Sequence, residues 1–374
     1  MEQLMYGLNI PTKIYYGRNI LEEGIRRAHS ETEIIRGNVL IVSTGRSLIR
    51  LGYLDMLKEA LNGISDVQDV IVYDQISANP KLIEVCDAVS LGRKEKCQVV
   101  VGFGGGSALD AAKAVAAGIP DGTDIKEMFR GNKEPQKVLP IIAVPTTAGT
   151  GSELSKAAIL SDTELGIKGG LRGSKLFPKA AIVDSVFTES VPFAITMETG
   201  FDVLAHAIES YVAKTASPFS EMISEYVIRE ATKSIRKLTK DLHDKQAREK
   251  MSFCSMIMGI NLGNTGTALP HRMQYPIGAH TESSHGAGLA ALYPSWIKYE
   301  KIYSPKKISR VFELMECKEI SDLLKEMKLN KKLTDLGIQK NQLKQMANEV
   351  TGNVGNDPAF VEKDIIYKIY QESF

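Results

Sequence analysis

The first half of the chain alternates short apolar runs with longer segments of helical periodicity. The runs are rich in β-branched residues and bounded by Gly, Pro or Asp, which predicts buried strands over residues 38–43, 70–74, 98–103, 139–144 and 180–184. Segments of helix length lie between them, including residues 46–61 and 108–118. Strands that alternate with helices predict an α/β fold with a parallel sheet and helices on both of its faces.

The pattern changes near residue 188. Beyond it, apolar residues recur at i, i+3 and i+4 over residues 197–214, 220–238, 245–263 and 319–330, and no comparable strand runs follow. The sequence therefore predicts an α/β domain over residues 1–188 and an all-α domain over residues 189–374. Two domains of different architecture form a cleft, where sites for small molecules usually lie.

Composition narrows the possible partners. Lys plus Arg total 46 and Asp plus Glu total 45, so the chain lacks the basic surplus of a protein that binds nucleic acid regardless of sequence. The N-terminal residues show no signal pattern, and no apolar run approaches the length of about 18 residues that suggests a membrane helix. The four cysteines show no CxxC spacing, which suggests free thiols. We expect a cytoplasmic protein without a membrane segment.

Two loops in the first half indicate a phosphate-containing ligand. Gly104, Gly105, Gly106 and Ser107 follow a predicted strand and begin a predicted helix, where backbone N–H groups favour a phosphate or diphosphate. A tight turn without a ligand is the alternative, and the stretch matches neither a Walker loop nor the usual Rossmann fingerprint. A second loop rich in hydroxyls, with Thr146 and Thr147, follows the next strand. Two such loops at strand ends fit a bound dinucleotide.

Half of the six histidines lie within fifteen residues, at His271, His280 and His285. Asp202 and His206 are spaced i, i+4 on a predicted helix and share one face. Alone, such a pair is most often an exposed polar face. Together with His271 and His285 it makes one carboxylate and three imidazoles, a set that suits iron(II) or zinc.

The whole chain resembles the iron-dependent (group III) alcohol dehydrogenases. The stretches that carry the resemblance are "GFGGGSALDAAKAVA", "PTTAGTGSE", "GFDVLAHAIESYVA" and "HRMQYPIGAHTESSHGAGLAALYP". The resemblance implies an N-terminal dinucleotide-binding domain, a helical catalytic domain, one metal ion in the cleft, reversible hydride transfer between a nicotinamide and a primary alcohol or aldehyde, and a homodimer. The ligand positions of the family fall on Asp202, His206, His271 and His285. Its cofactor positions fall on Asn79, Gly104, Gly105, Gly106, Ser107, Asp110, Thr146, Thr147 and Lys168.

The stretch after the first predicted strand bears on the choice of nicotinamide. Relatives that prefer NAD often carry an aspartate there, whereas this chain has Gly45, Arg46 and Ser47. A guanidinium and a hydroxyl suit the 2′-phosphate of NADP(H), which we therefore favour over NAD(H). The alternative is an arginine that faces solvent.

The chain departs from the family pattern at Tyr275. Relatives usually carry a second histidine four residues after the third ligand, and Tyr275 occupies that position here. A phenol with an ordinary pKa of about 10 is a poor base near neutrality. We interpret Tyr275 as a residue that shapes the pocket and orients substrate and His280 as a proton relay, the alternative for Tyr275 being simple packing.

Three other functions fit parts of this pattern. The same architecture supports a lyase of the dehydroquinate synthase type or an NAD- and zinc-dependent polyol dehydrogenase. The motif spacing in the second half favours the alcohol dehydrogenases over the lyase, and we find no basic pocket for a sugar phosphate. A protein that binds metal or nucleotide without turnover is the third possibility, against which the intact motifs argue.

Overall fold

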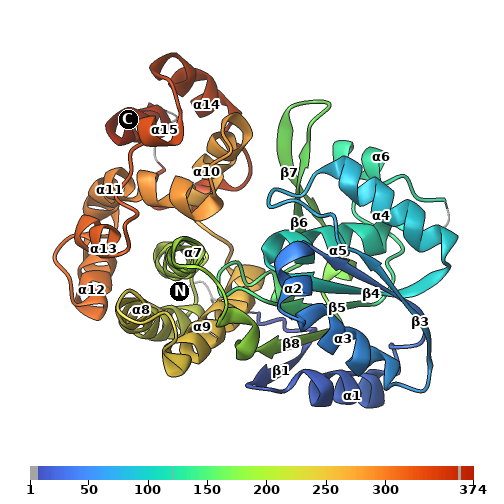
Figure 1. Cartoon of the computed structure of the whole chain (residues 1–374). Coiled ribbons are helices and arrows are strands. Elements are labelled where there is room, and N and C mark those ends of the chain that lie inside the picture. The colour runs from blue at the N-terminus through green and yellow to red at the C-terminus, as the bar shows by residue number, and fades with distance from the viewer. Residues whose placement is uncertain (1–6, 121, 361–363) are drawn as a thin grey trace. The chain divides into compact units, whose positions relative to one another are not determined.

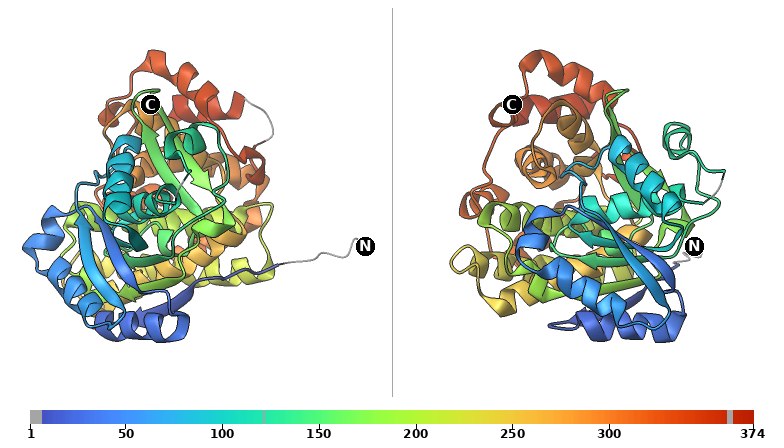
Figure 2. Two further views of the ribbon diagram at one scale, coloured as in Figure 1. Left: turned by 90° about the vertical axis from the view of Figure 1, so that its right-hand side faces the viewer. Right: turned by 45° about the vertical axis from the view of Figure 1, so that its right-hand side comes forward.

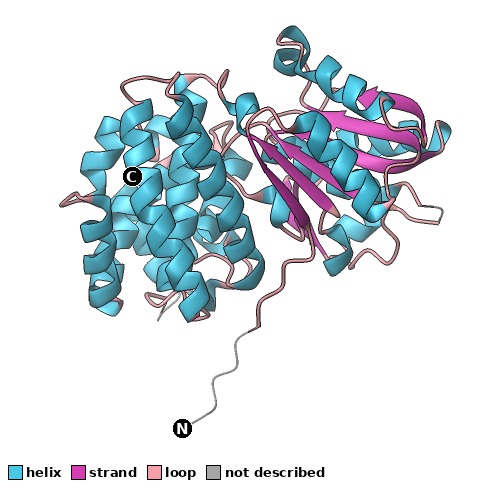
Figure 3. Ribbon diagram, turned by 90° about the horizontal axis from the view of Figure 1, so that it is seen from below, coloured by secondary structure: helices cyan, strands magenta, loops and turns pink. Residues whose placement is uncertain are grey.

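The computed structural model describes residues 7–120, 122–360 and 364–374, and its chain divides into two compact units. The first unit comprises Ile10–Ser190 and the second includes Val191–Phe374. Asn9 belongs to the second unit, where its backbone N–H donates to Oδ1 of Asn264 at 2.9 Å. Within the described residues all strands lie in the first unit, and the second is built from helices (Figure 3). The change of pattern near residue 188 thus marks a change from α/β to helical structure.

A parallel sheet forms the centre of the first unit, as predicted, and it has six strands where the sequence indicated five. Its strand order is β1-β8-β5-β4-β2-β3, and every neighbouring pair is parallel. The strands are β1 (Lys13–Gly17), β2 (Gly37–Ser43), β3 (Val67–Tyr73), β4 (Cys97–Gly104), β5 (Ile141–Pro145) and β8 (Ala180–Asp184).

Helices cover both faces of this sheet (Figures 1 and 2). Successive side chains of a strand point to opposite faces, so Leu40 of β2 packs with α4 and α5 while Ile41 packs with α1 and α3. The helices are α1 (Leu21–Thr32), α2 (Arg46–Arg50), α3 (Tyr53–Asn62), α4 (Leu82–Lys94), α5 (Gly106–Gly118) and α6 (Ile125–Arg130), with short 3-10 turns η1 (Ser152–Leu154), η2 (Ser174–Leu176) and η3 (Ser185–Thr188).

Three features of the first unit differ from the prediction. Strand β1 was not predicted, and neither was the separate antiparallel hairpin of β6 (Ala157–Asp162) and β7 (Ile167–Arg172). The prediction of one continuous helix over residues 46–61 is wrong. Gly52 adopts a φ of +73°, a left-handed conformation that ends one helix and begins another.

The second unit is organised around α7 (Phe193–Val212), which packs against α8, α9 and α11. Its other helices are α8 (Pro218–Leu238), α9 (Lys245–Asn264), α10 (Leu269–His280), α11 (His285–Tyr303), α12 (Pro305–Met315), α13 (Ile320–Glu326), α14 (Leu343–Glu349) and α15 (Asp364–Ser373), with 3-10 turns η4 (Thr334–Leu336), η5 (Lys340–Gln342) and η6 (Val354–Asn356). Across the described part of the chain, no helix is both long and apolar enough to cross a membrane.

Candidate metal centre and cofactor site

The first two predicted ligands lie on α7, a helix that is buried on all sides at this point. Every residue from Gly200 to Val212 is buried, and Asp202 and His206 are only 3% and 5% exposed. The alternative for this pair, an exposed polar face, is therefore excluded. Burying a carboxylate and an imidazole costs free energy unless both are paired.

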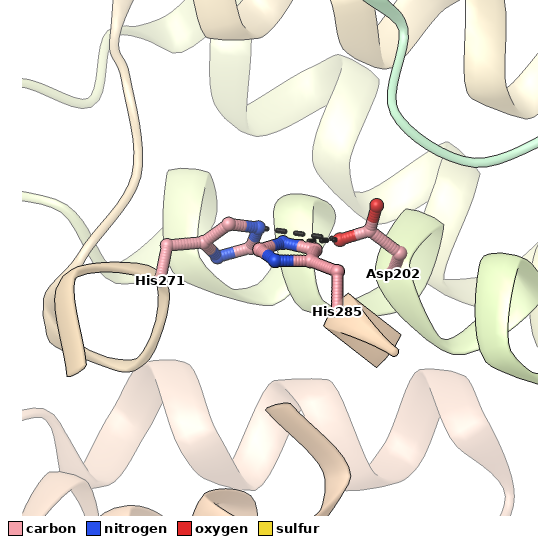
Figure 4. Close-up of side chains that lie close together, drawn as sticks. All are labelled: Asp202, His271 and His285. Atoms are coloured by element: carbon pink, nitrogen blue, oxygen red, sulfur yellow. Dashed lines mark hydrogen bonds and ion pairs between the residues drawn. The ribbon is translucent and has the colours of Figure 1, made fainter. Parts of the chain in front are cut away.

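Three imidazole nitrogens converge on one carboxylate oxygen. His271 of α10 and His285 of α11 place Nε2 at 3.3 Å and 3.5 Å from Oδ1 of Asp202 (Figure 4). Nε2 of His206 lies 3.7 Å from the same oxygen, and its ring is stacked on the ring of His271 with the centroids 4.3 Å apart. Three helices thus bring the four predicted ligands together.

This donor set fits a divalent cation. One ligand atom from each of Asp202, His271 and His285 lies within 4.8 Å of the other two. Ligand atoms of a tetrahedral site with bonds of about 2.1 Å are about 3.4 Å apart, which is close to the nitrogen–oxygen distances here. His206 lies outside this group of three, so its side chain would have to move most to complete the set. One carboxylate with imidazoles suits iron(II) or zinc.

Electrostatic interactions within the cluster are strong in the metal-free protein. Burial alone would raise the pKa of Asp202, but the three nearby imidazoles outweigh it and lower that pKa. Burial alone would lower the pKa of His271, but the carboxylates of Glu209 and Asp202 raise it to about 9. The two carboxylates thus favour the protonated form of His271, and a metal ion that binds there has to displace that proton.

A second carboxylate, absent from the sequence prediction, contacts the far side of His271. Glu209 of α7 is fully buried, and its Oε1 lies 2.7 Å from Nδ1 of His271. Its Oε2 accepts the backbone N–H of Ala268 at 2.9 Å. Glu209 follows Asp202 by seven residues, two helical turns, and so occupies the same face of α7. That spacing is the signal in the sequence that could have revealed it.

The start of α11 explains why His285 reaches Asp202. Oγ of Ser284 accepts the N–H of Ala287 at 3.2 Å and caps the helix, so that His285 is its first residue. A Cβ atom on Gly286 would stand 2.2 Å from the backbone oxygen of Glu198 in α7. Only glycine lets α11 begin this close to α7.

The two residues predicted to act in catalysis occupy different environments. Tyr275 lies one turn after His271 on α10 and is partly exposed, with the Arg272 guanidinium 5.9 Å from its ring centroid. His280 ends α10, and its Nε2 lies 2.7 Å from Oε2 of Glu349 at the end of α14. His280 is not among the residues grouped around Asp202.

The predicted cofactor loops in the first unit follow neighbouring strands. Gly45, Arg46 and Ser47 come after β2, Gly104 ends β4 and is followed by Gly105 and Gly106, and the threonines 146–147 come after β5. Strand β2 lies between β3 and β4 and is followed in the chain by β3, so the strand order reverses between β2 and β4. Dinucleotides bind outside the carboxyl ends of the strands at such a reversal.

The remaining cofactor candidates lie on segments that contact one another. Oγ of Ser107 donates to the backbone oxygen of Ala78, and Nζ of Lys168 donates to Oδ1 of Asn79 at 3.0 Å. Burial lowers the pKa of Lys168, although the charge of Asp110 opposes this effect. The loop after β3, the start of α5 and the hairpin strand β7 are thus held together.

Both carboxylate oxygens of Asp110 accept hydrogen bonds from other residues of the chain. Its Oδ1 accepts from Oγ of Ser152 at 2.5 Å and from Nζ of Lys113 at 3.2 Å, and its Oδ2 accepts the N–H of Ile159 at 2.9 Å. Lys113 is fully buried and was not predicted. This arrangement ties α5 to the turn η1 and to β6, and a role for Asp110 in cofactor binding would be to position those segments.

Comparison with known proteins agrees with these features in both units. The family model described as iron-containing alcohol dehydrogenase matches residues 11–185, and the model of the C-terminal part of the Fe-containing alcohol dehydrogenase family matches residues 196–374. The chain is 36% identical over 269 residues to the probable alcohol dehydrogenase EutG of Escherichia coli (strain K12), covering 69% of this chain and 68% of that protein.

Full-length relatives show the same relationship. The 1,3-propanediol dehydrogenase of Klebsiella pneumoniae is 27% identical over 397 residues, which cover 100% of both chains. The crystal structure of sulfoacetaldehyde reductase from Bifidobacterium kashiwanohense in complex with NAD⁺ superposes with a TM-score of 0.88 at 28% identity and covers 99% of each chain.

Proposed function

This chain belongs to the iron-containing alcohol dehydrogenase family, and from that premise we propose that Asp202, His206, His271 and His285 together hold its metal ion. Membership makes the protein an alcohol or aldehyde oxidoreductase and implies iron and NAD(H) as its cofactors. The observation that carries the proposal is the convergence of three Nε2 atoms on one buried oxygen of Asp202.

In this proposal the two units contribute different binding sites. A bound divalent ion acts as a Lewis acid on the substrate oxygen, and a bound nicotinamide supplies or accepts the hydride. Asp202 contributes the negative charge that offsets part of the charge of the ion. The glycine and threonine loops at the ends of β4 and β5 offer N–H and hydroxyl groups to a diphosphate. We assign the dinucleotide to the α/β unit and the metal ion to the helical unit.

A direct assay tests this function. The metal-loaded protein is incubated with NADPH or NADH and a panel of short aldehydes, and the loss of nicotinamide absorbance is followed. We expect turnover that disappears when a chelator removes the metal and returns when iron(II) is added back. Binding of nucleotide without turnover of any aldehyde or alcohol would contradict the proposal and favour a protein that only binds.

A preference for NADP(H) over NAD(H) is a further part of the proposal. Arg46 and Ser47 are both exposed, and they begin α2 directly after Gly45. A guanidinium beside a hydroxyl is suited to a phosphate group. We expect Arg46→Ala to weaken the binding of NADPH and to leave the binding of NADH almost unchanged.

The matched control for this variant is Arg50→Ala. Arg50 is exposed at the other end of α2 and should not affect either nucleotide. Titration of both nucleotides against the three proteins by fluorescence gives the dissociation constants. An unchanged affinity for NADPH in Arg46→Ala would refute the preference.

Tyr275 and His280 remain proposals for positioning substrate and for moving a proton. Tyr275 is supported by its place one turn after His271 on α10. The contact of His280 with Glu349 gives it a carboxylate partner through which a proton could pass, although it also offers a purely structural role. We expect Tyr275→Phe to raise KM and His280→Ala to change the pH dependence of kcat, both measured in the aldehyde assay. Unchanged values in both variants would remove these residues from the mechanism.

We also propose that the protein is cytoplasmic and forms a homodimer. All four cysteines are free thiols, and two of them are buried, as expected in a reducing compartment. The homodimer rests on resemblance to the family. Light scattering coupled to size-exclusion chromatography tests it, and a monomeric mass at micromolar concentration would contradict it.

A further inference from the structure

Two of the proposed ligands are contacted from behind by groups of different charge. Nδ1 of His271 lies 2.7 Å from Oε1 of Glu209, whereas Nδ1 of His285 lies 2.5 Å from Oε1 of Gln274. In both rings the other nitrogen, Nε2, faces Oδ1 of Asp202. The two histidines therefore present the same atom to the metal position but have a carboxylate behind one ring and a neutral amide behind the other.

Each of these contacts selects a tautomer of the imidazole. A carboxylate oxygen and an amide oxygen are acceptors, so each Nδ1 has to carry the proton. The lone pair of each Nε2 is then available to a metal ion. A carboxylate raises the basicity of the imidazole that it contacts and strengthens it as a ligand, and a neutral amide does so much less.

Glu209 is held rigidly in this role. It is fully buried, its Oε2 accepts the N–H of Ala268, and its Oε1 also accepts the hydroxyl of Tyr293 at 3.2 Å. Ala268 immediately precedes α10. The same carboxylate thus fixes both the ring of His271 and the start of the helix that carries it.

The two ligands also differ in their access to solvent. The side chain of His271 is 5% exposed and that of His285 is 31% exposed. Gln274 is itself fully buried, and its Nε2 has no hydrogen-bond partner among the described residues. Within the described residues, Oε1 of Gln274 therefore makes a hydrogen bond with His285, and Nε2 of Gln274 makes none.

We propose that Glu209 and Gln274 are positioning residues that make His271 the permanent ligand and His285 the exchangeable one, so that metal enters and leaves the site past His285. This inference rests on the metal site assigned above. It goes beyond that assignment because it ranks the ligands and names two residues that touch neither the metal nor the substrate.

The rate of metal loss to a chelator tests the ranking. Protein loaded with cobalt(II) is mixed with excess EDTA, and the decay of the cobalt absorption bands is followed. We expect Glu209→Gln to bind cobalt about 10–100-fold more weakly, the range typical of such partners, and to lose it faster than the parent. We expect Gln274→Glu to lose it more slowly, because the second histidine then also has a carboxylate behind it. A merely structural disturbance would accelerate both variants.

A second comparison covers the possibility that one of these variants does not fold. In the otherwise unchanged chain, His285→Ala should retain more cobalt than His271→Ala at equal chelator concentration. Faster loss from Gln274→Glu with a melting temperature equal to that of the parent, or stronger retention by His271→Ala than by His285→Ala, would overturn the ranking. If the parent itself bound no cobalt, the metal site proposed above would fail instead, so the two failures are distinguishable.

Discussion

At the scale of single residues, the candidate metal centre depends on positions that carry no ligand. Gly286 has no side chain at the point where α11 meets α7. Glu209 pairs with Nδ1 of His271, which would otherwise be a buried proton donor without a partner. Neither residue would contact a bound ion through its own atoms. The ligands are therefore placed as much by close packing and hydrogen bonding as by their own side-chain conformations.

Gly286→Ala tests the packing part of this explanation. The added methyl group would stand 2.2 Å from the backbone oxygen of Glu198, so α11 would have to shift and take His285 away from Asp202. We expect a loss of about 1–3 kcal/mol in the free energy of unfolding together with weaker metal binding. Urea denaturation and metal titration of the same preparation measure the two effects.

Gly355→Ala is the control for that variant. The nearest atom to a Cβ at position 355 is Oδ1 of Asn353 at 3.9 Å, which is ordinary contact within the same helical unit. It should leave both quantities close to those of the parent. Parent-like metal affinity in Gly286→Ala would show that His285 reaches Asp202 without this close approach.

At the scale of helices and strands, the sequence predicted elements that follow one clear period and missed those that do not. Buried parallel strands such as β4 are continuous apolar runs, and helices such as α8 carry a regular apolar face. Strand β6 begins with two alanines and ends with two polar residues, so it shows no apolar–polar alternation, and β7 contains two glycines, which are rare in strands. The sequence therefore predicts no strand there.

The candidate site likewise contains residues that the sequence predicts and residues that it does not. Its four proposed ligands could be singled out in the sequence because histidine is rare in this chain and because the resemblance gave their spacing. Gln274 could not be predicted, because a buried glutamine has no pattern of its own and gains meaning only from the partners that the fold brings to it. Glu209 was missed although its spacing of seven residues from Asp202 places both on one face of α7. The break at Gly52 was missed because a single glycine inside a helical pattern does not show its φ.

A buried pair of carboxyl groups links the helices that carry two of the ligands. Oδ2 of Asp357 accepts the N–H of Leu269, at the start of α10, and Nε1 of Trp296, on α11. Glu300 of α11 lies beside it, and both side chains accept the N–H of Ala359. Burial, reinforced by the charge of Asp357, raises the pKa of Glu300 to about 8, and burial raises the pKa of Asp357.

This pair predicts a dependence of stability on pH. The folded protein keeps a proton on Glu300 up to about pH 8, whereas an unfolded glutamate with a pKa of about 4.3 has released it. The unfolded state then binds fewer protons, so the contribution of this group is fully present below about pH 4.3 and is lost as the pH rises through 8. We expect Glu300→Gln to fall less steeply in free energy of unfolding between pH 5 and 8 than the parent.

Urea denaturation at a series of pH values checks this expectation. Glu316→Gln is the control, because Glu316 is an exposed acid at the end of α12. It should show the slope of the parent. A parental slope in Glu300→Gln would mean that the proton is not held on this residue.

At the scale of the whole molecule, the chain contains two compact units of different architecture. The α/β unit places glycine and hydroxyl-rich loops at the carboxyl ends of neighbouring strands, and the helical unit gathers one carboxylate and three imidazoles. Both halves match the iron-containing alcohol dehydrogenase family. The proposed chemistry and the ranking of the histidines both depend on the proposed set of metal ligands.

The metal content of purified His271→Ala tests this set most directly. Parent, His271→Ala and His280→Ala are loaded with iron(II) without oxygen, desalted and measured by elemental analysis. His280 is the matched control, because it lies on the same helix and contacts Glu349 instead of Asp202. We predict about one iron per chain in the parent and in His280→Ala, and none retained by His271→Ala. Stoichiometric iron in His271→Ala would contradict the account.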